Sequence, residues 1–172
     1  YKNSYRSGDN FITSNCLGMD CDNGHTDHEH EWITPDDVRR NFPDVPLAIH
    51  FSRHHMKPKD QKSARPRFHC LFAIEPTTDV KAYADMKARL NALFPYFDAQ
   101  ALDGARFFFG TDNPEVDFFP GTITLDECLE RYYPEEDSFA NLPDGTPQGR
   151  AVIQKGSRNR TMSVFAGKIL KR

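Results

Sequence analysis

One acidic stretch of the sequence reads Leu17-Gly18-Met19-Asp20-Cys21-Asp22-Asn23. Side chains alternate between the two faces of a β-strand, so Asp20 and Asp22 are predicted to share one face while Met19 and Cys21 point into a core. Two carboxylates held this close repel each other unless a cation neutralises them, and hard oxygen ligands suit Mg2+ or Mn2+ better than zinc. A metal site is one interpretation; the other is an acidic turn, Asp22-Asn23-Gly24, at a strand end.

The composition predicts a globular chain with one main core. The 172 residues are 38% hydrophobic and 27% charged, which is enough to bury the core of one domain. Lys and Arg number 22 against 25 Asp and Glu, for a net charge of −3. Any affinity for nucleic acid must therefore come from local clusters of cations and not from the global field.

The lack of a predicted membrane span or signal peptide favours a cytoplasmic protein, and so does the cysteine usage. No apolar run approaches the roughly 18 residues of a membrane span, and residues 1–6 lack the apolar core of a signal peptide. The cysteines at positions 16, 21, 70 and 128 are scattered, and Cys70 sits inside an apolar run. This pattern predicts reduced thiols and not a disulfide framework.

Residues 24–31 form a polar segment dense in imidazole and carboxylate, Gly-His-Thr-Asp-His-Glu-His-Glu. With Cys16 and Cys21 upstream, this segment could bind zinc, but neither CxxC nor HExxH spacing is present. A solvated insertion is the favoured interpretation.

Two apolar runs, residues 47–53 and 67–74, are predicted to be neighbouring antiparallel strands joined by a basic, proline-containing loop. In the second run, alternation places Arg67 and His69 together on one face and a row of apolar side chains on the other. A strand histidine can be merely structural. Cations opposite an acidic metal site are, however, what the phosphates of a nucleoside triphosphate require.

Three helices are predicted from caps and apolar spacing. Thr34, Pro35 and Asp37 begin a short helix that ends near Asn41; Asp79 caps a helix over residues 80–94; and Thr124 with Glu127 opens a helix over 125–133. The second helix has an apolar stripe and is expected to lie on the sheet, with stripe residues Val80, Tyr83, Met86 or Lys87, Leu90, Leu93 and Phe94.

Two aspartates between residues 95 and 110 are candidates for a third carboxylate beside Asp20 and Asp22. Asp98 follows an aromatic pair at a predicted strand start, Asp103-Gly104 is typical of a turn, and Arg106–Gly110 is predicted to be an aromatic strand. Either aspartate could be the third acid, and Asp98 is favoured because Asp103 is the more plausible turn residue.

In order along the chain, Asp20-x-Asp22, the later Arg67-x-His69, and Asp98 ahead of the aromatic run resemble the archaeo-eukaryotic primase superfamily, specifically the prim-pol domains of plasmid and phage replication proteins. The resemblance covers roughly residues 11–120. Independently, Gly156-x-Arg158-Asn159 and the apolar pattern after it resemble the opening of a helical primase C-terminal domain.

The resemblance implies an α/β (α+β) primase-polymerase fold with a mixed or antiparallel sheet, like that of an RNA recognition motif, flanked by helices. The expected organisation is a catalytic domain over residues 1–133, a polar linker rich in proline and glycine over 134–150, and the truncated start of the helical domain over 151–172.

The resemblance also assigns site residues. Asp20, Asp22 and Asp98 would hold two Mg2+ or Mn2+ ions, and His69 would contact the phosphates of the incoming nucleotide. Residues expected to bind triphosphate or template are Arg53, Lys57, Arg67 and Arg106. This sequence departs from the family pattern in two ways: Arg67 replaces a small hydroxyl residue two before the histidine, and the histidine-rich loop has no counterpart.

The implied function is that of a DNA primase/polymerase, which transfers nucleotides from (d)NTPs under the direction of a template during replication of a mobile element, phage or plasmid. Implied partners are single-stranded DNA template, primer and a fused or associated helicase, without a membrane. A metal-dependent nuclease or relaxase-like enzyme is an alternative, although no tyrosine nucleophile adjoins a paired-histidine strand. A non-catalytic DNA-binding module is another, which leaves the Asp20/Asp22 pair unexplained.

Overall fold

The computed structural model describes residues 2, 5 and 7–134. The chain divides into two compact units, Tyr1–Pro134 and Glu135–Arg172, and the described residues belong to the first. Of the predicted linker, only Pro134 is described, and the predicted helical segment over 151–172 lies outside the described residues. That part of the domain organisation stays a prediction.

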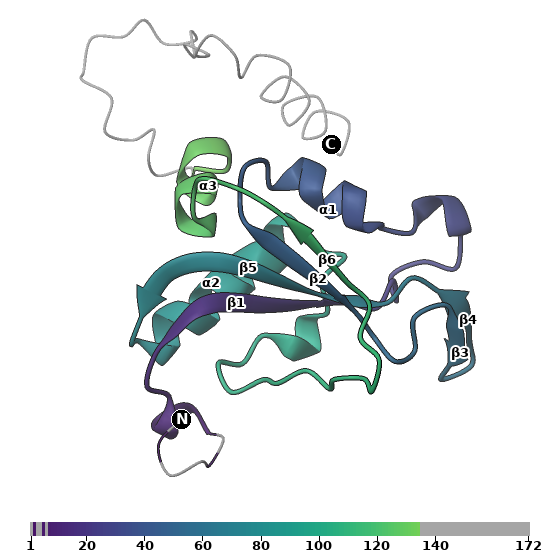
Figure 1. The fold of residues 1–172 in the computed structure, drawn as a ribbon, viewed down its shortest axis with the longest axis horizontal. Coiled ribbons are helices and arrows are strands. Elements are labelled where there is room, and N and C mark those ends of the chain that lie inside the picture. Colours follow the sequence, from purple (N-terminus) through teal and green to yellow (C-terminus); the bar gives the residue numbers. More distant parts are fainter. Residues whose placement is uncertain (1, 3–4, 6, 135–172) are drawn as a thin grey trace, which may run out of the picture. The chain divides into compact units, whose positions relative to one another are not determined.

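A four-stranded antiparallel sheet organises the first unit, with strand order β1-β5-β2-β6. The strands are β1 (Ser14–Cys21), β5 (Phe68–Thr77), β2 (Leu47–Phe51) and β6 (Val116–Phe119) (Figure 1). The mixed α/β class and the antiparallel pairing of β2 with β5 are confirmed. The basic loop between them contains a hairpin that was not predicted, formed by β3 (Lys57–Lys59) and β4 (Lys62–Arg65).

The described residues form α-helices α1 (Pro35–Asn41), α2 (Val80–Leu93) and α3 (Leu125–Tyr132), with short 3-10 helices η2 (Gly8–Asn10), η3 (Glu29–Glu31) and η4 (Ala99–Ala101). Both predicted capping boxes are present: the hydroxyls of Thr34 and Thr124 accept from the backbone three residues on, and those residues' carboxylates reach back. Asp79 caps α2 through the amides of Lys81 and Ala82. The predicted helix starts are therefore confirmed.

All three α-helices pack on one face of the sheet, and α2 lies behind the sheet in Figure 1. This core contains the strand residues that alternation predicted to be inward, including Met19, Cys21, Cys70 and Phe72, which are fully buried. Leu93 was predicted to belong to the buried stripe of α2 but is 40% exposed. Successive residues advance about 100° around a helix, so Leu93 falls outside the stripe that buries its neighbour Phe94.

Two predictions about residues 95–110 were wrong. Arg106–Gly110 has no regular secondary structure, and Asp98 does not start a strand but caps η4, where its carboxylate accepts the amide of Gln100. The aromatic run is placed by a side chain instead of by strand pairing, because Phe108 packs against the sheet. The predicted turn at Asp103-Gly104 is present.

None of the helices in the described part of the chain combines the length and apolar character needed to cross a bilayer.

Candidate active site on the open face of the sheet

Three polar side chains line up across three neighbouring strands. Asp20 on β1 is paired in register with His69 on β5, and His69 is paired with His50 on β2. Residues directly opposite each other in an antiparallel sheet point to the same side. The row therefore lies on the face away from the helices, which we call the open face. The pairing of β1 with β5 thus brings the acidic strand beside the strand that carries His69.

The contacts along this row are close. His69 Nε2 lies 3.8 Å from Asp20 Oδ1, and the Nδ1 atoms of His69 and His50 are 3.1 Å apart. Burial, followed by the proximity of His50, lowers the pKa of His69 to about 4. The imidazole is consequently neutral at pH 7, and its contact with Asp20 is not an ion pair.

Asp20 is a buried carboxylate with an unsatisfied oxygen. Its Oδ1 is buried without a hydrogen-bond partner. Burial, followed by the charges of Asp22 and Asp98, raises the pKa of Asp20 to about 7, while Arg106 and Lys59 oppose this rise. A buried polar atom left unpaired costs about 1–3 kcal/mol, and a bound cation would offset that cost. This is the strongest sign of a ligand site on the open face.

Asp22 follows β1 and faces the basic hairpin. Lys59 Nζ lies 3.1 Å from Asp22 Oδ2, and Arg67 Nε lies 4.0 Å from Asp22 Oδ1. Asp22 therefore lies between the site and the cations of the hairpin. Lys59 was not among the predicted site residues, because its contact with Asp22 depends on the β3–β4 turn, which the sequence pattern did not predict.

The structure separates the two candidates for a third acid. The amide of Asp98 donates to the carbonyl of Asp20 over 2.8 Å, and the Asp98 carboxylate is near enough to raise the pKa of Asp20. Asp103 is exposed, and its carboxylate accepts the amide of Ala105. The tertiary fold thus brings Asp98, although distant in sequence, beside the acidic strand.

The carboxylates fit a hard divalent cation in chemistry but do not converge on one point. Within the part of the chain that the structure describes, no three His, Cys, Asp or Glu side chains are grouped closely enough to hold a metal ion. Asp22 is turned toward Lys59, and Asp98 is engaged in its cap. The assignment of Asp20, Asp22 and Asp98 as metal ligands stays a prediction.

The guanidinium of Arg67 is hydrogen-bonded to the backbone around the hairpin. This group is buried, with Nη1 donating to the carbonyls of His54 and Lys57 over 3.1 and 2.6 Å and Nη2 to that of Ser63 over 3.4 Å. These bonds fasten the hairpin to β5, since they join the residue just before β5 to acceptors in β3, in β4 and in the segment that precedes β3. Arg67 therefore has a local structural role at this position.

The other predicted cations are exposed at different places. Arg106 acts on both site groups, because its charge lowers the pKa of Asp20 and of His69. Arg53 lies over the ring of Phe109, with 5.3 Å from Cζ to the ring centroid, and Lys57 stands on β3.

Phe108 covers part of the open face. Its ring centroid lies 4.4 Å from that of His69. A Cβ atom built on Gly18 would lie 2.3 Å from Phe108 Cε2, so a glycine on β1 allows this ring to approach the strand. Covering the row with an aromatic ring removes water from His69, which is the main cause of its lowered pKa. No local sequence pattern predicts this contact.

A buried lysine was also missed as a site neighbour. Lys87 on α2 is 1% exposed and donates to the carbonyl of Asp103 over 3.3 Å. Burial lowers its pKa to about 8, and Asp103 and Asp20 partly oppose this effect. The helical stripe contained the signal, since a lysine at an apolar position requires an acceptor.

The histidine-rich loop is held by hydrogen bonds within its own surroundings. Arg65 is buried and donates to the carbonyls of Asn23 and Thr26 and to the carboxylate of Asp27. Its guanidinium also lies over the ring of Trp32. The expectation of an exposed insertion agrees with the exposure of residues 27–31.

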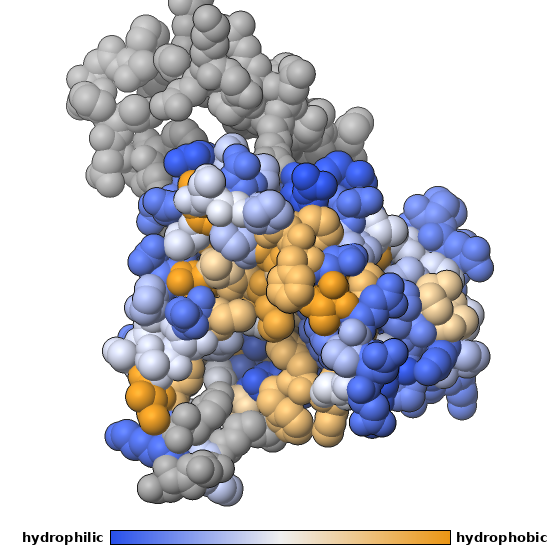
Figure 2. All heavy atoms as spheres, in the orientation of Figure 1, coloured by the Kyte–Doolittle hydropathy of each residue, from blue (hydrophilic) through white to orange (hydrophobic). Residues whose placement is uncertain are grey.

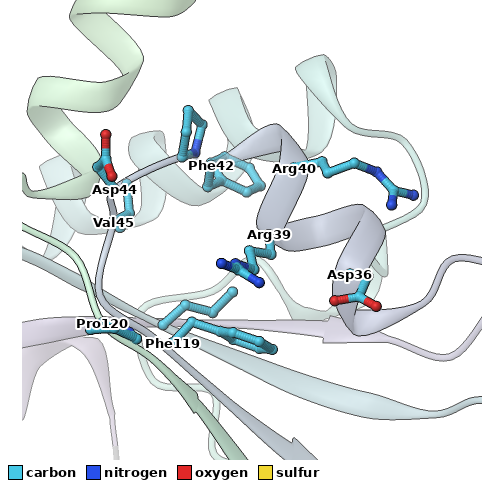
Figure 3. Close-up of a pocket in the computed structure, with 10 residues that line it drawn as sticks. Asp36, Arg39, Arg40, Phe42, Asp44, Val45, Phe119 and Pro120 are labelled. Carbon is cyan, nitrogen blue, oxygen red and sulfur yellow. The ribbon is translucent and has the colours of Figure 1, made fainter.

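A separate pocket of about 370 Å³ lies on the helix side of the sheet and does not include the row. Figure 3 shows Arg39 of α1 reaching toward Phe119 of β6, with Cζ 5.4 Å from the ring centroid. The candidate site is thus defined by side-chain chemistry on the open face and not by this pocket.

Comparisons with protein-family models, with curated proteins and with solved structures gave no match to this chain.

Proposed function

We propose that this chain is a nucleotidyltransferase of the primase-polymerase type, which joins (d)NTPs to a nucleic acid strand under the direction of a template. One observation carries the proposal: buried Asp20 has an unsatisfied oxygen, is flanked by Asp22 and Asp98, and faces a neutral His69 on the next strand. Perturbed carboxyl and imidazole groups that meet in this way are typical of functional sites.

The three carboxylates would hold two Mg2+ or Mn2+ ions, which would activate the attacking 3'-hydroxyl and neutralise the leaving pyrophosphate when bound. The chain itself already moderates the repulsion among these acids, because Lys59 is paired with Asp22. The phosphates of an incoming nucleotide would compete with Asp22 for Lys59, so that Lys59 would have two alternative partners.

His69 is suited to donate a hydrogen bond from Nε2. In the contact between the two Nδ1 atoms, one ring must donate and the other accept. With His50 as the donor, the proton of neutral His69 is on Nε2, the atom that faces Asp20. The opposite arrangement would point a lone pair at Asp20 when that carboxylate is ionised, as it would be with a cation bound. His50 is therefore a positioning residue that keeps His69 ready to donate to a phosphate oxygen.

The two rival functions make different predictions. A metal-dependent nuclease would cleave a strand without requiring nucleoside triphosphates, and a non-catalytic module would bind DNA without either reaction. The decisive experiment incubates the protein with labelled nucleotides, a primer-template and Mg2+ or Mn2+. Extension of the primer supports the proposal, whereas cleavage without extension, or binding alone, contradicts it.

The third acid can be tested in the same assay. We expect Asp98→Asn to reduce metal-dependent incorporation by about 10- to 100-fold, because one ligand charge beside Asp20 is lost. Asp103→Asn is the matched control: it removes the same charge from the same connection and leaves the side chain able to accept the Ala105 amide. Loss of incorporation in Asp103→Asn alone would reverse the assignment.

A further inference from the structure

Several aromatic side chains stand exposed near the candidate site. Phe107 is 47% exposed, Phe109 61% and Phe118 77%. Together with Arg53 we call them the aromatic surface. Figure 2 shows apolar side chains gathered in a band down the middle of the viewed face, with polar side chains on either side. A band of this kind is costly in water and marks an interaction surface.

The rings of Phe107 and Phe109 are held in a defined arrangement. Their centroids are 4.8 Å apart with an edge-on orientation, and the guanidinium of Arg53 lies over Phe109. Between them, Phe108 turns the other way and packs against Gly18 and His69. The inward ring anchors the segment, so its two neighbours are presented outward beside the acidic row.

Phe118 extends the surface along the same face of the sheet. It is paired with Ala48, which is paired with Leu71, and Leu71 is paired with Gly18. Phe118 therefore points to the same side as His69 and Asp20. Its row lies two residues along the strands from theirs.

The charges around the aromatic surface indicate what it binds. Arg53 belongs to it, Arg106 adjoins Phe107, and the hairpin adds exposed Lys57 and Lys62. In the sequence, the exposed acids Asp112, Glu115 and Asp117 lie between Phe109 and Phe118, whereas Arg53 lies over Phe109, so the cations accompany the Phe107/Phe109 pair. A single-stranded nucleic acid offers both complementary features, flat apolar bases for the rings and phosphates for the cations.

We propose that the aromatic surface binds single-stranded nucleic acid, with bases stacked on Phe107, Phe109 and Phe118 and phosphates on Arg53 and the hairpin lysines. The identification of that strand as the template rests on the proposed function. The stacking itself requires neither nucleotide nor metal.

The test is the affinity for a fluorescein-labelled oligothymidylate, measured by fluorescence anisotropy without divalent cations. We expect Phe107→Ala/Phe109→Ala to weaken binding by about 5- to 100-fold, because each stacked base contributes through a π-face. Phe109→Trp should bind at least as tightly as the wild type, and Phe109→Leu as weakly as Phe109→Ala. Leu93→Ala, which removes an exposed apolar side chain on α2, is the control and should bind normally.

Circular dichroism and thermal unfolding confirm that each variant is folded, and size-exclusion chromatography reports self-association. Equal binding by Phe109→Leu and Phe109→Trp, or by the double alanine variant and the wild type, overturns the proposal. So does a dimer that is lost on substitution without a change in strand affinity, since the surface would then join two copies of the chain. Failure of the wild type to incorporate nucleotides, with strand binding intact and aromatic-dependent, contradicts the proposed function alone.

Discussion

Asp20→Asn is expected to lower the rate of nucleotide incorporation by at least about 100-fold while the protein remains folded. Asp20 is the carboxylate whose pKa is affected by the charges of both neighbouring acids and of two nearby cations. Its unsatisfied oxygen is the best-placed ligand for a cation. Asparagine keeps the size of the side chain but removes the negative charge, so cation binding and its contribution of several kcal/mol to the transition state are lost.

Thermal unfolding with and without Mn2+ separates this loss from misfolding. A cation that binds only the folded state raises the melting temperature, so Mn2+ should stabilise the wild type and leave Asp20→Asn unchanged. The control is Asp36→Asn, a substitution of an exposed aspartate on α1. Equal stabilisation of the wild type and Asp20→Asn by Mn2+, or full incorporation by Asp20→Asn, would contradict the metal assignment.

Without divalent cations, the same variant should change how stability depends on pH. The folded-state pKa of Asp20 is about 7, above the unfolded value of 3.8, so ionisation opposes folding. The stability from this group is fully present below pH 3.8 and is lost as the pH rises through 7, by a few kcal/mol. Asp20→Asn lacks this loss and should gain stability over the wild type between pH 5 and 8. The same dependence of stability on pH in the wild type and in Asp20→Asn would contradict this prediction.

His69 acts in the opposite direction over part of this range. Its pKa is lowered to about 4 from 6.5, so its contribution is present above pH 6.5 and lost as the pH falls toward 4. The wild-type curve alone therefore mixes two effects. The difference between the wild type and Asp20→Asn isolates the contribution of the carboxyl group.

Local signals were enough to predict much of the fold. Thr34 and Thr124 cap helices through contacts three residues away, and such contacts are set by the sequence next to them. The alternation on β5 also predicted correctly that His69 lies on the face opposite Phe72, because strand geometry fixes the period. These predictions required no knowledge of the tertiary structure.

The site depended on contacts that no local signal contains. His50 meets His69 only because β2 and β5 pair in one particular register, and Lys59 meets Asp22 only because the hairpin folds back. The run Arg106–Gly110 was wrongly predicted as a strand because three consecutive phenylalanines favour β structure. Packing of Phe108 over Gly18 decides its conformation instead, and that contact joins residues far apart in the sequence.

The last large effect concerns the triphosphate. We expect His69→Ala to weaken the binding of a nucleoside triphosphate in the presence of Mn2+ by about 10- to 100-fold, because a hydrogen bond to a charged group contributes about 1.5–3 kcal/mol. Isothermal titration calorimetry measures this affinity. His30→Ala is the matched control, since it also removes an imidazole, but from the exposed loop that follows β1.

A second comparison shows whether His69 acts through its proton or through packing. His69→Gln keeps an N–H donor and should recover part of the lost affinity, whereas His69→Phe keeps the contact with Phe108 but cannot donate and should resemble His69→Ala. His50→Phe should also weaken nucleotide binding, because it removes the partner that directs the His69 proton to Nε2. Unchanged nucleotide affinity in His69→Phe would return His69 to a structural role, since packing alone would then account for its position beside Asp20.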